Sequence, residues 1–131
     1  MINIGTSIKT ILTDETLNNL LGGDDKVCPI IMPEEIDYPF IVYRSTGMNT
    51  DDNKDNSVDI DIVTIMIIAG DYDSSVTIAT RVRNLMETFT SDLINDVKLV
   101  NRQEEQYEGA FIQMLTFDVE NNKKIWHIEK H

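Results

Sequence analysis

The clearest indication of the fold is the stretch at residues 58–69, Val-Asp-Ile-Asp-Ile-Val-Thr-Ile-Met-Ile-Ile-Ala. In the first half of the stretch, Asp59 and Asp61 alternate with Val and Ile; in the second half nearly every side chain is apolar. Alternation is typical of a strand with one exposed face, and a continuous apolar run is typical of a strand covered on both faces. We therefore expect one long strand that is half exposed where it begins and buried where it ends.

Other segments have the composition of strands. Residues 40–43, Phe-Ile-Val-Tyr, start a strand rich in β-branched and aromatic side chains. Two more strands are expected at residues 97–104 and 110–119, joined through Tyr107-Glu108-Gly109. The apolar run at 27–32 contains Pro29, which suits a sheet edge or a loop entering a sheet.

The stretch between the first two strands, Asn49 to Ser57, is almost entirely polar. We expect it to be a long hairpin connection with solvated charges. Charges at such a place also discourage aggregation between strand edges.

Apolar residues recur at helical spacing in two places. Near the N-terminus the pattern predicts a helix with a break, where Thr13 or Asp14 caps the second piece and Gly22-Gly23 ends it in a left-handed turn. The strongest pattern spans Ser74 to Phe89, with Asp73 or Ser74 as its cap. Its single apolar stripe consists of Ile78, Val82, Leu85 and Phe89. One stripe predicts a helix that lies across one face of a sheet.

This order of elements predicts an α+β fold. We expect a mostly antiparallel sheet of about four to five strands, with an N-terminal helix and one long helix packed on one face. At 131 residues the chain is expected to form one domain over residues 1–122, followed by a C-terminal extension over 123–131.

The charge of the chain excludes several classes of function. There are 11 Lys and Arg against 23 Asp and Glu, a formal net charge of −12. Nucleic-acid binding draws affinity from clustered Lys and Arg, and anionic lipid attracts the same residues, so neither partner is expected. No apolar run approaches the ~20 residues that span a bilayer, and no secretion signal is recognisable, so we expect synthesis in a cytoplasm.

The residues that would carry catalysis are few. Nucleophilic catalysis needs a base beside the nucleophile, and the lone Cys28 would have to meet His127 or His131 from the polar tail. One Cys and two His give no paired spacing for zinc, and no Gly-rich phosphate loop is present. The carboxylate pairs Glu104–Glu105 and Asp59–Asp61 have no evident apolar pocket to separate their pKa values. We expect no enzyme, no cofactor and no metal.

One acidic stretch resembles a calcium loop in part. Asp51, Asn53, Asp55, Ser57 and Asp59 fall at every second position. However, the sixth position holds Asn instead of Gly, and the twelfth holds Ile instead of the bidentate Glu. A solvated hairpin tip is the main interpretation, with weak calcium binding as the alternative.

Three groups of residues, taken in chain order, carry a resemblance to a known protein family. The first comprises residues 17–22 (Leu-Asn-Asn-Leu-Leu-Gly), Val27-Cys28-Pro29, Pro33 and residues 38–43 (Tyr-Pro-Phe-Ile-Val-Tyr). The second comprises residues 58–65 and a helix with Ala79, Val82, Arg83 and Leu85. The third is residues 111–117, Phe-Ile-Gln-Met-Leu-Thr-Phe. Over about residues 8 to 120 the sequence resembles the tail terminator, or tail completion, proteins of long-tailed bacteriophages.

The resemblance implies a structural virion protein of the tail and neck, made in the cytoplasm of a bacterial host. Such a subunit forms a ring, commonly hexameric, on the head-proximal end of the tail tube. The ring ends tube polymerisation and meets the head connector, and DNA passes through its lumen without specific binding. Its partners would be copies of itself, the tube protein and a neck protein.

Candidate contact residues follow from charge and exposure. We expect them in the polar connection, on the exposed side of the long helix, in the 97–104 region and in the tail: Asp51, Asp52, Lys54, Asp55, Arg81, Arg83, Glu104, Glu105 and Trp126. Two alternatives stay open, namely another neck or head–tail connector component, or a small acidic binding module with weak calcium affinity at residues 51–59.

Overall fold

The computed structural model describes residues 4–23, 25–29, 37–53, 56–89, 91–92 and 94–122; at 48–53, 56–58 and 122 it describes the backbone alone. The elements, in chain order, are α1 (Ile4–Ile11), α2 (Glu15–Leu21), β1 (Val27–Pro29), β2 (Phe40–Asn53), β3 (Asn56–Ala69), α3 (Tyr72–Thr88), β4 (Ile94–Tyr107) and β5 (Ala110–Asn122). Within this described part, no helix is both long and apolar enough to cross a membrane. Residues 123–131 lie outside the described residues, so their separation as an extension stays a prediction.

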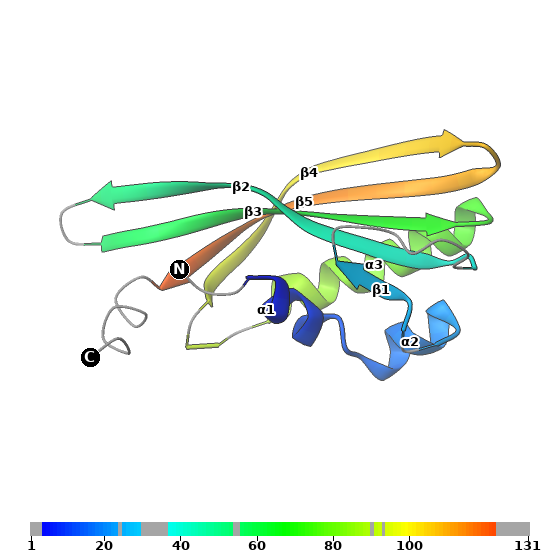
Figure 1. Cartoon of the computed structure of the whole chain (residues 1–131), viewed down its shortest axis with the longest axis horizontal. Coiled ribbons are helices and arrows are strands. Elements are labelled where there is room, and N and C mark those ends of the chain that lie inside the picture. The colour runs from blue at the N-terminus through cyan, green and yellow to red at the C-terminus, as the bar shows by residue number, and fades with distance from the viewer. Residues whose placement is uncertain are drawn as a thin grey trace.

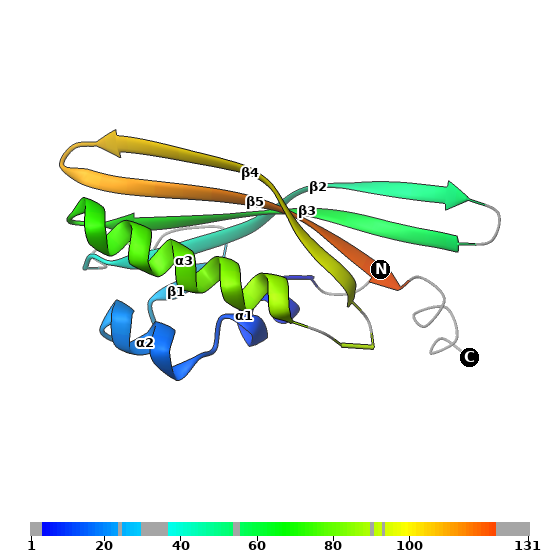
Figure 2. The same cartoon turned by 180° about the vertical axis from the view of Figure 1, so that it is seen from behind.

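The five strands form one sheet in the order β1-β2-β3-β5-β4. The short edge strand β1 runs parallel to β2, and every other neighbouring pair is antiparallel. All three helices lie against the same face of the sheet (Figures 1 and 2). The α+β class, the mostly antiparallel sheet and the long helix on one face are thereby confirmed.

The core lies between that face and the helices. Alternate residues of β3, namely Val63, Ile65 and Ile67, are at most 1% exposed and pack in one cluster with buried side chains of the helices. From α3 the cluster takes Ile78, Ala79, Val82 and Met86, with Leu85 and Phe89 partly buried beside them. The single apolar stripe is therefore confirmed.

A smaller apolar cluster occupies the opposite face of the sheet. It comprises Phe40, Val42, Ile68 and Ala110, with the partly buried Met66 and Ile112. Because Ile67 and Ile68 point to opposite faces and are 0% and 8% exposed, the end of β3 is covered on both sides as its apolar run predicts.

The expected long connection over Asn49–Ser57 is wrong. The register of β2 and β3 continues from Phe40–Ile68 to Asn53–Asn56, so only residues 54–55 separate the strands. Antiparallel strands pair through backbone N–H and C=O groups, which are the same whatever the side chains are. A polar sequence therefore does not end the ladder, and the β2–β3 hairpin extends well beyond the helices (Figure 1).

The phase of the alternation in β3 also differs from the expectation of solvated acids. Asp59 and Asp61 are 9% and 4% exposed, whereas Ile60 and Ile62 are only partly buried. Side chains of a strand alternate between faces, so the odd-numbered set that includes Val63 and Ile65 carries both aspartates onto the helix-covered face.

Two helix starts illustrate the capping chemistry. Asp14 caps α2 as one of the two predicted candidates, and Gly22 ends that helix in the left-handed conformation at φ 81°. For α3 the predicted cap is wrong: the helix begins at Tyr72 and its cap is Asp71. The Asp71 carboxylate accepts hydrogen bonds from the N–H and the hydroxyl of Ser74, both at 2.8 Å, so Ser74 is the partner of the cap.

The last two strands form a second hairpin, longer than predicted. Its register runs from Ile94–Asn121 to Tyr107–Ala110, so the turn is Glu108-Gly109. Both turn residues have positive φ, 49° and 82°, as in a type I′ turn, whose twist matches that of the flanking strands.

Candidate functional site

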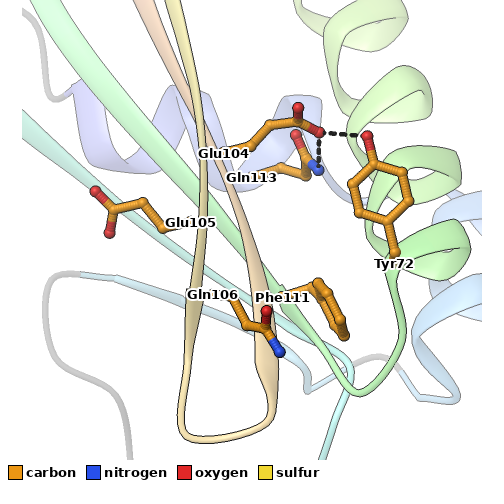
Figure 3. A pocket seen from close by; sticks show the side chains of 6 residues that line it. All are labelled: Tyr72, Glu104, Glu105, Gln106, Phe111 and Gln113. Carbon is orange, nitrogen blue, oxygen red and sulfur yellow. Dashed lines mark hydrogen bonds between the residues drawn. The ribbon is translucent and has the colours of Figure 1, made fainter.

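A shallow pocket lies where the start of α3 meets the β4–β5 hairpin (Figure 3). Its volume is about 230 Å³. It is lined by Tyr72, Glu104, Glu105, Gln106, Phe111 and Gln113. Tyr72 is 47% exposed and its ring meets that of Phe111 edge-on, with centroids 6.0 Å apart, so an aromatic surface flanks the polar groups.

Hydrogen bonds connect the helix to both strands in this pocket. The Tyr72 hydroxyl donates to Glu104 Oε2 at 2.7 Å, and Gln113 Nε2 donates to the same oxygen at 2.8 Å (Figure 3). Gln113 Nε2 also donates to Ser75 Oγ at 3.2 Å, and Ser75 Oγ donates to the carbonyl of Tyr72 at 2.7 Å. Gln113 is 2% exposed, so a buried amide fixes the position of a surface carboxylate.

The network sets the charge of its members. The hydrogen bond from Gln113, followed by that from Tyr72, lowers the pKa of Glu104. The same carboxylate raises the pKa of Tyr72. At neutral pH Glu104 is therefore an anion and Tyr72 a phenol, which suits a fixed acceptor for a partner's donor rather than proton transfer.

Glu105, the other predicted carboxylate of this region, points to the opposite side of the hairpin (Figure 3). Neighbouring residues of a strand alternate between faces, so Glu104 and Glu105 do not act as a pair. Only Glu104 joins the hydrogen-bond network.

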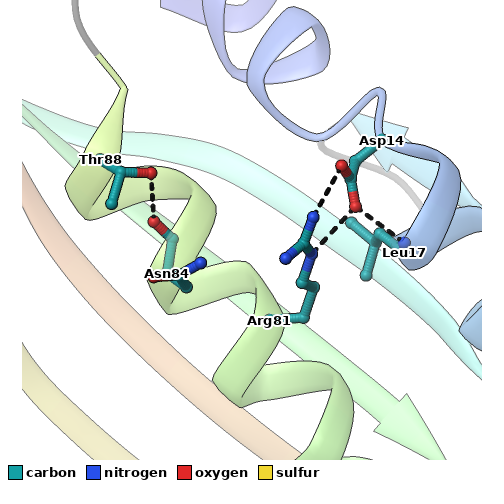
Figure 4. A network of polar contacts seen from close by, with 5 residues as sticks. All are labelled: Asp14, Leu17, Arg81, Asn84 and Thr88. Carbon is teal, nitrogen blue, oxygen red and sulfur yellow. Dashed lines mark hydrogen bonds and ion pairs between the residues drawn. The ribbon is translucent and has the colours of Figure 1, made fainter.

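The predicted arginines have partners within the chain. Arg81 Nε and Nη2 donate to the two carboxylate oxygens of Asp14 at 3.0 and 2.9 Å (Figure 4). Arg83 Nε donates to Glu87 at 2.8 Å, one turn further along α3. A contact of either arginine with a neighbouring subunit stays a prediction.

The remaining predicted contact residues are not brought together in the described part of the chain. Asp51 and Asp52 belong to the far end of β2, where the backbone alone is described. Lys54, Asp55 and Trp126 lie outside the described residues.

Sequence reasoning missed a polar group on the covered face. Asn121 of β5 lies opposite Asp59 in the register, is 4% exposed, and donates through Nδ2 to Asp61 Oδ2 at 2.5 Å. Burial, more than any other cause, raises the pKa of Asp61. The expectation that this carboxylate has no apolar surroundings is therefore wrong. The alternation of buried side chains along β3, continued from Val63 back to Asp59, would have predicted that the carboxylate is buried.

Cys28 is buried in the edge strand β1. Burial raises the pKa of its thiol, whereas a nucleophilic cysteine needs a lowered one. In residues 4–122, so far as they are described, no group of three or more His, Cys, Asp or Glu is arranged to hold a metal ion.

Comparison with known proteins gives a structural match. No family model matches the sequence, and no curated protein matches it either. Among solved structures, the chain is similar to a chain of the virion of a native gene transfer agent particle, with a TM-score of 0.72 and 14% sequence identity. The match covers 87% of this chain and 90% of that chain. At this identity the likeness shows a shared fold over nearly the whole of both chains.

Proposed function

We propose that this chain is a structural protein of a phage-like virion, and that it caps the head-proximal end of the tail tube as a ring. In that role it ends tube polymerisation and joins the tail to the head connector. The observation that carries the proposal is the fold shared with a virion chain over 87% and 90% of the two lengths. The resemblance of residues 8 to 120 to tail terminators supports the specific role.

The shape of the subunit suits a ring. Head-to-tail rings require two different surfaces on each subunit that match one another. The β2–β3 hairpin extends beyond the helices, and the tip of the β4–β5 hairpin points in the opposite direction, beside the start of α3 (Figures 1 and 2). The two hairpin ends therefore offer two different surfaces on one subunit.

The charge of the chain suits a conduit for DNA. At −12 per subunit, a ring would carry a strongly negative potential. Phosphate is repelled by such a surface, so DNA would pass without being held.

The alternative of a calcium-binding module at residues 51–59 has lost its structural basis. Calcium loops fold around the ion, whereas residues 50–53 and 56–59 are extended and paired with each other. Another neck component with the same subunit fold remains the second candidate, because the shared fold supports it equally.

The test is the assembly state, alone and on a tube. Light scattering over a concentration series, with negative-stain images, should show a ring near six times the chain mass of 15.0 kDa. Added to polymerising tail tube protein of the same particle, the protein should shorten the tubes and appear at one end. A monomer that leaves tube length unchanged and never decorates an end would refute the proposal.

A ring that binds the head connector and leaves tube growth unchanged would favour the neck component. Tubes of unchanged length with rings at both ends would also contradict a terminator. The two candidates therefore give different results in one set of experiments.

A further inference from the structure

We propose that the open edge of β2 in one copy of this chain pairs with β4 of the next copy, so that the sheet continues from subunit to subunit. The proposal rests on the ring proposed above and names the contact that builds it. The partner at each edge is a second copy of the chain.

Two edges of the sheet are open in the described part of the chain. β4 is the last strand on one side. On the other side β1 pairs only with Ile41–Tyr43, so no described strand lies beside the rest of β2 as far as Asn53. The backbone N–H and C=O groups of such an edge are a template for a strand of another chain.

The free edge of the short strand β1, by contrast, is blocked. Pro29 has no N–H group, and Lys9 Nζ donates to the carbonyl oxygen of Val27 at 3.0 Å. Proline and lysine on an edge are features that prevent pairing with another chain. Pairing between copies is therefore left to β4 and to the part of β2 beyond β1.

The directions of the two strands suit a head-to-tail contact. Three antiparallel pairings lie between β2 and β4, so the two strands run in opposite directions within one subunit. A second copy placed in the same orientation beside β4 therefore presents its β2 antiparallel to β4. Each copy keeps one open edge for a further copy, as a ring requires.

Both edges contain a regular stretch of the same length. The register shifts between Ser45 and Gly47 in β2, and between Leu99 and Asn101 in β4. Beyond these points the pairing continues without a shift through Asn53 and through Tyr107. The stretches 47–53 and 101–107 are therefore the regular parts of the two edges.

Alternation along β2 decides which of its backbone groups point outward. The Ile41 N–H bonds to the carbonyl of Lys26 on the β1 side, so Ile67, the partner of Ile41, does not bond to β2. The other odd-numbered residues of β3 share this orientation. Beyond the irregularity, the residues of β2 opposite them are Met48, Thr50 and Asp52, whose N–H and C=O groups point outward.

The same alternation applies to β4. Tyr107 and Ala110 flank a two-residue turn, which makes them a hydrogen-bonded pair. The outward backbone groups of the regular stretch therefore belong to Arg102, Glu104 and Gln106.

Full antiparallel overlap of the two stretches brings outward residues opposite outward residues. The pairs are Met48 with Gln106, Thr50 with Glu104, and Asp52 with Arg102. Each pair of this kind exchanges two backbone hydrogen bonds, so the contact forms about six.

Charge favours this register. Arg102 is exposed and forms no ion pair within the described part of the chain, and the overlap supplies an aspartate directly opposite it. Opposite charges across a strand pair are stabilising, and like charges are destabilising. Moving the register by two residues would place Asp52 opposite Glu104 or beside the irregularity of β4.

An exposed aromatic ring fits the same register. Tyr107 is 67% exposed, and the overlap places it opposite Gly47. Aromatic side chains pack over a glycine on the neighbouring strand of a sheet.

The first experiment reverses the charges of the central pair. Asp52→Arg and Arg102→Asp should each lower the association constant of a contact by roughly three- to tenfold, measured by light scattering or by the fraction of tube ends that carry a ring. The double variant should recover the association of the unsubstituted protein. Arg44→Asp, an exposed arginine of β2 outside the stretch, is the matched control and should associate normally.

The second experiment removes one outward N–H group. Thr50→Pro deletes no bond of the β2–β3 ladder, since a proline is tolerated where the N–H points away from the sheet. Its Tm as a monomer should be nearly unchanged, whereas association should weaken by more than tenfold.

The outcomes separate the strand pairing from the ring itself. Rings that form equally well in Thr50→Pro and in both charge variants would overturn the strand pairing and leave the proposed function standing. A loss in Arg102→Asp without a loss in Asp52→Arg, or a double variant that does not recover, would overturn the pairing of β2 with β4. A chain that never associates, alone or on a tube, would overturn both proposals.

Discussion

Arg81 and Asp14, 67 residues apart in the sequence, form a two-point ion pair through Nε and Nη2 at 3.0 and 2.9 Å. Asp14 Oδ2 simultaneously accepts a hydrogen bond from the N–H of Leu17 at 2.9 Å, which caps α2 (Figure 4). The Asp14 carboxylate therefore both caps the N-terminus of α2 and links α2 to α3. Two parallel bonds between a guanidinium and a carboxylate fix orientation as well as distance.

The double role of Asp14 predicts unequal effects of removing either partner. Asp14→Ala loses the cap, worth about 1 kcal/mol, and the ion pair as well, whereas Arg81→Gln leaves the cap intact. Urea unfolding should therefore show a larger loss of stability for Asp14→Ala. The double variant should be less destabilised than the sum of the two, because both singles remove the same pair.

Arg83→Gln is the matched control for Arg81→Gln. Arg83 and Glu87 form an exposed pair on one helix turn, with 53% and 38% of their side chains accessible. Exposed pairs of this kind contribute little, so the midpoint of unfolding should hardly move. If Arg83→Gln lowered the free energy of unfolding as much as Arg81→Gln does, the loss in Arg81→Gln could not be assigned to its ion pair with Asp14.

The same ion pair predicts a dependence of stability on pH. The hydrogen bond from Arg81, more than any other cause, lowers the pKa of Asp14 from its ordinary 3.8. A carboxyl with a lowered folded-state pKa stabilises the fold above its unfolded-state pKa, and this stabilisation is lost as pH falls through the folded-state value. The difference in unfolding free energy between the unsubstituted protein and Arg81→Gln should therefore shrink as pH falls through and below the ordinary carboxyl value of 3.8. A constant difference over that range would contradict the assignment.

Val82 tests the packing of α3 on the sheet. Its side chain is 0% exposed in the core cluster, so Val82→Asp buries a charge without a partner and should abolish cooperative unfolding. Thr80→Asp, on the exposed side of the same helix, is the control and should fold normally. Circular dichroism during thermal unfolding separates the two. A folded Val82→Asp would be incompatible with this position of the helix.

Shortening the β2–β3 hairpin tests its role in assembly. Replacing residues 52–57 by Asn-Gly keeps Asp51 opposite Val58 and closes the strands with a type I′ turn. This end of the hairpin lies beyond the helices (Figure 1), so Tm should be nearly unchanged, whereas ring formation on the tube should weaken. If the protein with the shortened hairpin assembled as well as the unsubstituted protein, the end of the hairpin would not be part of the interface. A control of equal length, with 52–57 replaced by a polar Ser/Thr/Asn sequence, separates charge from reach.

The turn at Glu108-Gly109 predicts a stabilising substitution. Glu108 has φ 49°, a conformation that costs a non-glycine residue about 1–2 kcal/mol and that Asn tolerates better. Glu108→Asn should raise stability by up to about 1 kcal/mol, measured by urea unfolding. Gly109→Ala, at φ 82°, should lower it. A lower stability of Glu108→Asn would show that the Glu108 side chain makes a contact that offsets the cost of its positive φ.

The elements that depend on local chemistry could be predicted from the amino-acid sequence. Apolar spacing placed the long helix, β-branched composition placed the start of β2 and the end of β3, and capping chemistry narrowed the start of α2 to Thr13 or Asp14, of which Asp14 is the cap. The α+β class follows from their order. All of these depend on residues within a few positions of one another, which a single sequence displays directly.

The faces and partners that those elements meet depend on how the chain packs in three dimensions. The polar residues after Met48 remain part of strand β2 because their backbone groups pair with those of the neighbouring strand β3. Asp59 and Asp61 lie on the covered face because the phase of β3 is set by the packing of Val63, Ile65 and Ile67 against the helices, and a strand cannot change phase without a bulge. Arg81 meets Asp14, and Glu104 meets Tyr72 and Gln113, only after α3 has docked on the sheet. Pairing across many residues is fixed by register and docking, and neither is encoded in the local pattern of any one segment.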